Sequence, residues 1–107
     1  MVWQPKRGGQ EKDVPEATAT FTDPRAHHFW DGQGWTIERF KPVLGIHVDA
    51  WDLYLIYGPD ARWDDASPPR PIFWMHQLMG VDNGPLLDAD VFGKRILQTL
   101  ASLSRPR

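Results

Sequence analysis

Hydrophobic residues along this chain fall into short runs and into longer stretches with helical spacing. Alternating or continuous apolar runs of four to eight residues predict strands, and apolar residues repeated every three or four positions predict helices. Strands are predicted at residues 2–5, 26–30, 52–57 and 72–78. Helices are predicted from residue 14, over residues 35–44 and from the capping residue Asp88 to Leu103. The resulting order, β-α-β-α-β-β-α, favours a mixed sheet with helices on both faces.

Two of these segments allow a second interpretation. Residues 14–19 follow a capping residue, Asp13, and hold a proline in the first turn, but Thr18 and the neighbouring Thr20 would also suit a strand. Residues 26–30 are short and aromatic and run into a turn, although the preceding Asp23-Pro24 could open a helix. We favour a helix for the first segment and a strand for the second.

The two later helices are defined by their apolar positions. In residues 35–44, Pro42 is expected to limit or kink the helix, and Gly45 is expected to end it. The final helix repeats apolar residues every three or four positions, which predicts one buried stripe. The stripe consists of Phe92, Ile96, Leu100 and Leu103.

Composition restricts the class of protein. The chain has 107 residues, the size of a single domain, and 41% of them are hydrophobic. A net charge of −2 gives no reason to expect nucleic acid as a partner. There is neither an apolar run of eighteen residues nor the apolar centre of a signal peptide, so we expect no membrane association and a cytoplasmic location. The chain has no cysteine, which excludes disulfides, thiolate metal sites and cysteine nucleophiles.

The chain is rich in tryptophan, with six residues of this type, and core packing is the simplest explanation. A surface that contacts a protein or a ligand is the alternative, and Trp63, in a loop, could either plug the core or present such a surface. The candidate residues for this surface are Trp35, Trp51, Trp63, Trp74 and His76. His76 lies in the apolar run FWMHQLMG without a nucleophile or acidic partner at a recognisable spacing, so a structural role is favoured.

Metal binding has little support in the sequence. His27 and His28 are adjacent, and in a strand they would point to opposite faces, which prevents them from sharing an ion with Asp31. His47 and Asp49 could share a face, but two ligands are too few for a structural site. We therefore assign no catalytic, cofactor-binding or metal-binding residue.

Three stretches together resemble bacterial domains of thioredoxin-like fold, near the thiol-disulfide oxidoreductase and peroxiredoxin branch. They are VWQPKRGGQEKDVPEAT, DPRAHHFWDGQGW and WDLYLIYGPDARW with PPRPIFWMHQL. The resemblance covers residues 2 to about 104. It implies that the first strand and helix of the usual fold, with their Cys-x-x-Cys motif, are missing here. It also implies that this missing strand would lie between the strands at 2–5 and 52–57, so that two strand edges would be left without a neighbour.

Two main hypotheses of function follow. In the first, the chain is a redox-inactive thioredoxin-like domain that acts through contacts with a partner protein or with another copy, made at its exposed sheet edges. In the second, it is the C-terminal portion of a thiol-disulfide oxidoreductase whose cysteine-bearing segment lies outside this chain. A third and weaker hypothesis is a ligand-binding protein that uses the tryptophans.

Overall fold

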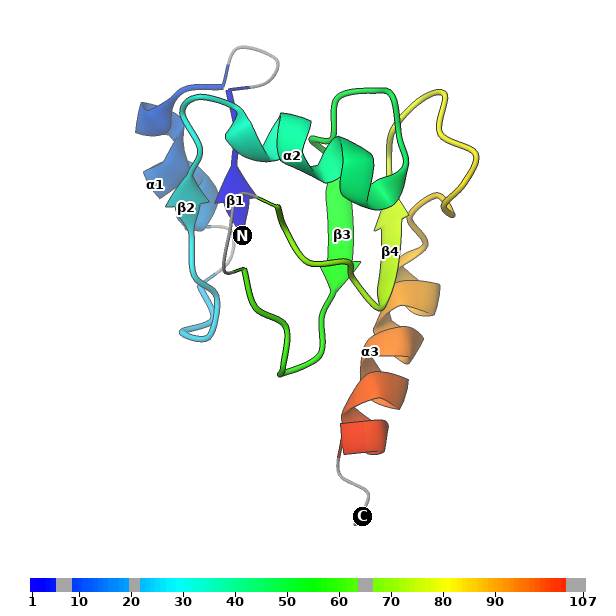
Figure 1. Cartoon of the computed structure of the whole chain (residues 1–107). Coiled ribbons are helices and arrows are strands. Elements are labelled where there is room, and N and C mark those ends of the chain that lie inside the picture. Colours follow the sequence, from blue (N-terminus) through cyan, green and yellow to red (C-terminus); the bar gives the residue numbers. More distant parts are fainter. Residues whose placement is uncertain (6–8, 20–21, 64–66, 104–107) are drawn as a thin grey trace.

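The computed structural model describes residues 1–5, 9–19, 22–63 and 67–103. Its strands are β1 (Val2–Trp3), β2 (Phe29–Trp30), β3 (Leu53–Ile56) and β4 (Phe73–His76). Its helices are the short 3-10 helix η1 (Glu11–Asp13), α1 (Val14–Thr18), α2 (Trp35–Leu44) and α3 (Ala89–Leu103). The predicted mixture of helices and strands is therefore confirmed (Figure 1). Each of these observed strands is shorter than the residue range predicted for it. In the described ranges, no helix has the length and apolar character needed to cross a membrane.

The strands form two separate pairs, and this corrects the prediction of one mixed sheet. β1 pairs with β2 in parallel, with Val2 opposite Phe29 and Trp3 opposite Trp30. β3 pairs with β4 in an antiparallel hairpin, with Leu53 opposite His76. β1 and β3 lie on the inner sides of the two pairs but do not bond to each other (Figure 1).

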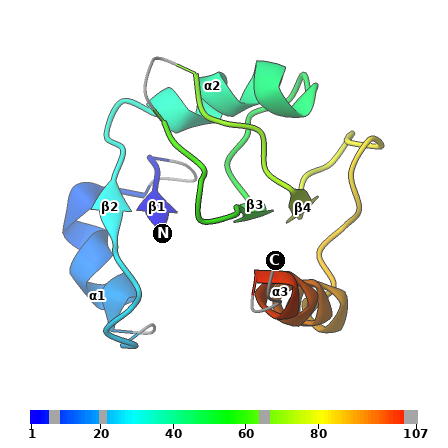
Figure 2. The same ribbon diagram turned by 60° about the horizontal axis from the view of Figure 1, so that its bottom comes forward.

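Helices lie on both sides of these strands. α2 runs across one side of both pairs, whereas α1 lies beside β1 and β2 on the other side (Figure 2). α3 lies on that same second side, next to β3 and β4, and the two helices are well apart (Figure 2). The side with α1 and α3 is thus covered at its two ends and not over the middle.

The core lies between α2 and the β3–β4 hairpin. Its buried residues are Phe40, Leu44, Ile46, Ala50 and Leu78. The side chains of Leu53 and Leu55 pack against this cluster, while Tyr54, between them, meets the ring of Phe92 on α3 at a centroid distance of 6.2 Å. This alternation is the period of two expected of a strand with both faces covered.

Local chemistry fixes the two ends of α2. The carboxylate of Asp31 accepts hydrogen bonds from the backbone N–H of Trp35 (3.0 Å) and of Thr36 (2.6 Å), which are donors at a helix N-terminus. Partial burial alone would raise the pKa of Asp31, but these bonds and one from the Thr36 hydroxyl lower it below its ordinary value. Gly45 ends the helix with φ of 66°, as predicted. Pro42 lies inside the helix and does not end it.

The end of the chain departs from the prediction most clearly at α3. Asp88 caps the helix as expected, because its carboxylate accepts bonds from the backbone N–H groups of Asp90 and Val91. The predicted buried stripe is wrong, since no described residue of α3 is buried. Only Phe92 of that stripe is half-buried, and the other three side chains, Ile96, Leu100 and Leu103, are exposed.

Candidate functional site

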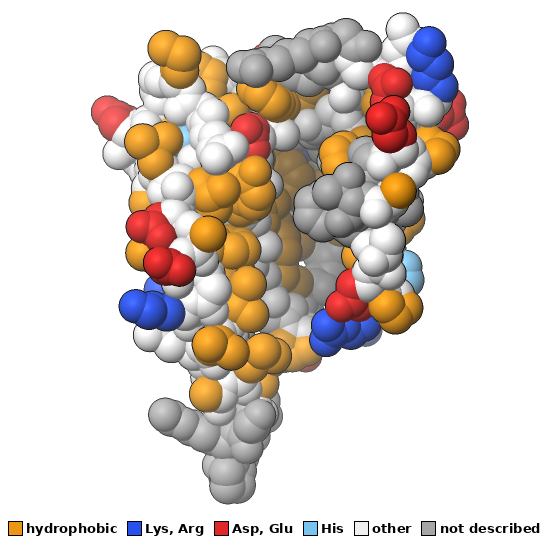
Figure 3. All heavy atoms as spheres, turned by 180° about the vertical axis from the view of Figure 1, so that it is seen from behind, with side chains coloured by type: hydrophobic (Ala, Val, Ile, Leu, Met, Phe, Trp, Pro, Cys, Tyr) orange, Lys and Arg blue, Asp and Glu red, His pale blue; other side chains and the backbone are white. Residues whose placement is uncertain are grey.

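A groove separates the two strand pairs. Its volume is about 360 Å³, and it is lined by residues of β1, α2, β3 and the segments next to them. The lining consists of Met1, Val2, Gln4, Thr36, Phe40, Ala50, Trp51, Leu53, Leu55, Tyr57 and Trp63. Among the described residues, no charged side chain is part of this lining. Figure 3 shows the hollow from the side of α1 and α3, with apolar side chains along one of its walls.

One edge of the groove is the backbone of β3. In the hairpin, the N–H of Gln77 donates to the carbonyl of Asp52 (3.1 Å), and the N–H of Ile72 donates to that of Ile56 (2.9 Å). Backbone groups of successive strand residues point to opposite sides, so those of Tyr54 also point to β4. The backbone groups of Leu53 and Leu55 therefore point into the groove, where no described residue bonds to them.

The other edge of the groove is the backbone of β1. The carbonyls of Met1 and Trp3 accept hydrogen bonds from the N–H groups of Phe29 (2.9 Å) and Asp31 (2.8 Å), so both residues face β2. By the same alternation, the backbone groups of Val2 face the groove. The groove thus lies between two strand edges whose hydrogen-bonding groups point toward each other.

Aromatic residues close one end of the groove. Trp63 stacks on Trp35 with ring centroids 5.5 Å apart, and it meets the ring of Phe40 edge-on at 5.8 Å. The guanidinium of Arg39 lies 4.6 Å from the ring centre of Trp35 on the outside of this stack. Trp63 therefore packs onto α2 and lines the groove at the same time, although it remains partly exposed.

The five residues singled out from the sequence do not form one site. Trp51 and Trp63 line the groove, and Trp35 is reached from it only through Trp63. Trp74 packs against the core and is not part of the lining. His76 is fully buried.

The hydrogen bonds of His76 show the role of a histidine inside an apolar strand. Its Nδ1 accepts a hydrogen bond from the backbone N–H of Leu78 (3.0 Å), so the proton is on Nε2. Nε2 then donates to the carbonyl of Gly84 (2.8 Å). Both ring nitrogens are bonded to backbone, and the ring joins β4 to the loop that follows it. This arrangement leaves neither nitrogen available for proton transfer or for a metal.

Other histidine and aspartate side chains considered from the sequence take part in local contacts. His28 accepts a hydrogen bond from the indole N–H of Trp3 (3.1 Å) and stacks on that ring. Asp49 lies 3.2 Å from the ammonium of Lys41. Within the described ranges, no three histidine, aspartate or glutamate side chains come close enough together to hold a metal ion.

Comparisons with known proteins add no function to this picture. No protein-family model, no curated protein and no solved structure matches the chain. The groove was located by the structure. The resemblance to thioredoxin-like domains implied strand edges without a neighbour next to residues 2–5 and 52–57. The sequence did not identify Phe40 and Ala50 as walls, because the segments that carry them meet at the groove only in three dimensions.

Proposed function

We propose that this chain is a thioredoxin-like domain without redox activity that acts by binding protein, and that an extended polypeptide segment inserts between β1 and β3. The observation that carries the proposal is the pair of facing strand edges across a groove whose described lining has no charged side chain. Backbone donors and acceptors along an uncovered strand edge can pair with a strand from another polypeptide, which adds hydrogen bonds at both edges. Addition of a strand to an exposed edge is a common mode of peptide recognition.

A peptide inserted between two edges differs measurably from a peptide added to one edge. Alternate residues of an inserted strand direct their N–H groups to β1 and to β3. N-methylation of the odd residues therefore blocks bonding to one edge, and N-methylation of the even residues blocks bonding to the other edge. A peptide at a single edge loses affinity in only one of the two series.

The test uses the whole chain and a capped eight-residue peptide of alternating valine and threonine, with binding followed by calorimetry. We expect both N-methylated series to bind at least about tenfold more weakly, because each loses several backbone bonds. Amide hydrogen exchange at Leu53 and Leu55 is expected to slow when the unmethylated peptide binds. A peptide with lysine in place of valine is the control, because no described side chain of the lining carries a negative charge to pair with it.

Loss of binding in only one methylated series would show addition at a single edge and contradict insertion. No protection of Leu53 and Leu55 by the unmethylated peptide would contradict the proposed function altogether.

The oxidoreductase hypothesis uses the same groove in another way. There the inserted strand belongs to a cysteine-bearing segment of a longer polypeptide. The coding sequence in frame upstream of Met1 separates the two hypotheses. A Cys-x-x-Cys motif followed by helix-forming sequence at that place favours the oxidoreductase, and unrelated coding sequence or a stop codon favours the binding domain.

A further inference from the structure

The chain contains a single asparagine, Asn83, and a glycine follows it in the loop between β4 and α3. An asparagine loses its side-chain amide when the backbone nitrogen of the next residue attacks its side-chain carbonyl carbon. A glycine at that next position hinders the attack least, because it has no Cβ. The pair Asn83-Gly84 is therefore the place in this chain where spontaneous deamidation is expected first.

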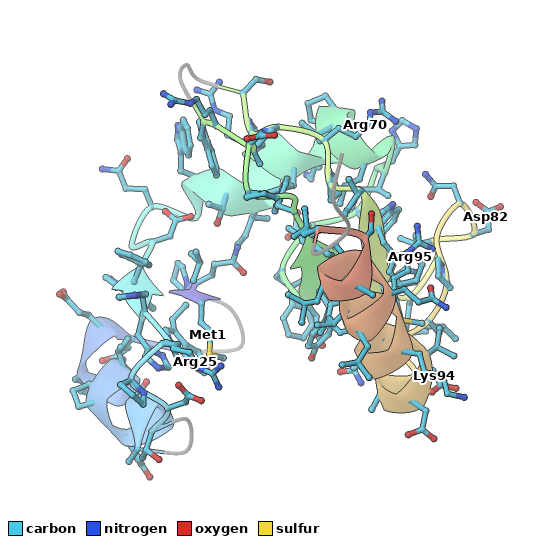
Figure 4. The ribbon with its side chains drawn as sticks, turned by 90° about the horizontal axis from the view of Figure 1, so that it is seen from below. Met1, Arg25, Arg70, Asp82, Lys94 and Arg95 are labelled. Carbon is cyan, nitrogen blue, oxygen red and sulfur yellow. The ribbon has the colours of Figure 1, made fainter. Side chains whose placement is uncertain are left out.

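The structure leaves the reacting groups of this pair accessible. Both residues lie in a bend outside the helices and strands, and Asn83 is exposed. Figure 4 shows Asp82, the residue before Asn83, on the same loop at the outer side of the molecule. No described residue accepts a hydrogen bond from the backbone N–H of Gly84, so the attacking nitrogen is not held in such a bond within the described ranges.

The side chain of Asn83 anchors this loop to α2. Its Nδ2 donates a hydrogen bond to the carbonyl of Leu44 (2.7 Å) and a longer one to the carbonyl of Gly45 (3.4 Å). Carbonyls at the C-terminal end of a helix have no partner within the helix, so a side-chain donor satisfies them. The amide group that deamidation removes is thus the group that joins the loop to the end of α2.

The segment directly after Asn83 covers the outer edge of β4. The carbonyl of Gly84 accepts the hydrogen bond from Nε2 of His76 (2.8 Å), and the N–H of Leu87 donates to the His76 carbonyl (2.8 Å). The position of Gly84 therefore determines whether the buried ring of His76 keeps its partner.

We infer that Asn83 is a modification site, at which deamidation releases the loop after β4 from α2. The Gly84 nitrogen forms a bond to the side-chain carbonyl carbon of Asn83, the bond from that carbon to the amide nitrogen breaks, and ammonia leaves with the proton of the Gly84 nitrogen. Water then opens the cyclic imide and gives aspartate or isoaspartate at this position. The inference does not depend on what occupies the groove.

Both products weaken the anchor. Aspartate places carboxylate oxygens, in place of a donor, against the carbonyls of Leu44 and Gly45, and a negative charge is unfavourable at a helix C-terminus. Isoaspartate also lengthens the backbone before Gly84 by a methylene group, which displaces the carbonyl that His76 binds. The outer edge of β4 then loses part of its cover.

The test incubates the whole folded chain in mildly alkaline buffer and locates the mass gain by peptide mass spectrometry. We expect conversion at Asn83, faster at higher pH because the Gly84 nitrogen must lose its proton. The purified product is expected to melt about 4–8 °C lower, as for the loss of about one hydrogen bond. Amide exchange at Leu87 should become faster, whereas exchange at Ile72, whose N–H bonds to Ile56 within the hairpin, should not change.

Asn83→Gln is the matched control, because glutamine keeps an amide donor but forms its larger imide ring much more slowly, so no mass gain is expected over the same period. Asn83→Asp reproduces one product without incubation and should show the same lower melting temperature. Conversion that occurs only in urea-unfolded chain, and not in folded protein, would overturn the modification site. An unchanged melting temperature in both the product and Asn83→Asp would overturn the release of the loop.

Discussion

The two edges of the β3–β4 hairpin differ in the hydrogen-bond partners of their backbone groups. On the outer edge, the N–H of His76 donates to the carbonyl of Pro85 (3.2 Å), and the His76 carbonyl accepts from the N–H of Leu87 (2.8 Å). On the inner edge, the corresponding groups of Leu53 and Leu55 point into the groove. The loop after β4 therefore covers the outer edge, whereas no described residue bonds to the backbone groups of the inner edge.

The histidine on the covered edge is expected to give the largest effect. His76→Ala leaves the N–H of Leu78 and the carbonyl of Gly84 without their partners in a buried site, and we expect a loss of about 3 kcal/mol in the free energy of unfolding. Urea denaturation measures it. The exposed His47→Ala is the control and should change stability by less than about 0.5 kcal/mol. A similar loss in both variants would contradict the structural role of His76.

The glycine that approaches the same site provides the next test. A Cβ on Gly84 would lie 2.5 Å from ring atoms of Trp74, so Gly84→Ala is expected to cost about 1–3 kcal/mol. Gly93 in α3 has no atom within 4 Å of the corresponding position. Gly93→Ala should therefore stabilise the protein by up to about 1 kcal/mol through helix propensity. Thermal unfolding of both variants checks the difference in sign.

Asp31 stabilises the N-terminus of α2, the helix that lines one side of the groove. Asp31→Ala removes the acceptor for two backbone donors at the helix N-terminus and is expected to cost about 1 kcal/mol at neutral pH. Because the folded-state pKa of Asp31 is lowered, this contribution is complete above its ordinary value of 3.8 and is lost as the pH falls through the lowered pKa. Unfolding curves of wild type and variant should therefore converge in acid. A difference that persists there would show that the carboxylate charge is not involved.

The smallest effect is expected on the open side. Leu97 is 67% exposed, and Leu97→Gln should change the free energy of unfolding of the isolated chain by less than about 0.5 kcal/mol. Chemical denaturation measures it. A loss of more than about 1 kcal/mol would mean that this side chain is already packed against the protein.

The sequence predicted those elements whose signals are local. Asp88 and Gly45 were recognised as a helix cap and a helix end, and β3 was recognised from its apolar run. The helical periodicity of α3 did not predict burial correctly, since a repeat of apolar residues shows which side chains lie together but not whether anything covers them. The order of the elements did not give the separation into two strand pairs, because β1 and β3 are distant in the chain, whereas the resemblance implied two strand edges without a neighbour.

The stack of Trp63 on Trp35 has a consequence for how this molecule can be observed. Two indoles with centroids 5.5 Å apart couple their electronic transitions, and one of them forms part of the groove wall. Any guest that displaces Trp63 would alter the near-ultraviolet circular dichroism of the pair. The protein therefore carries its own optical reporter of occupancy, without a dye or a label.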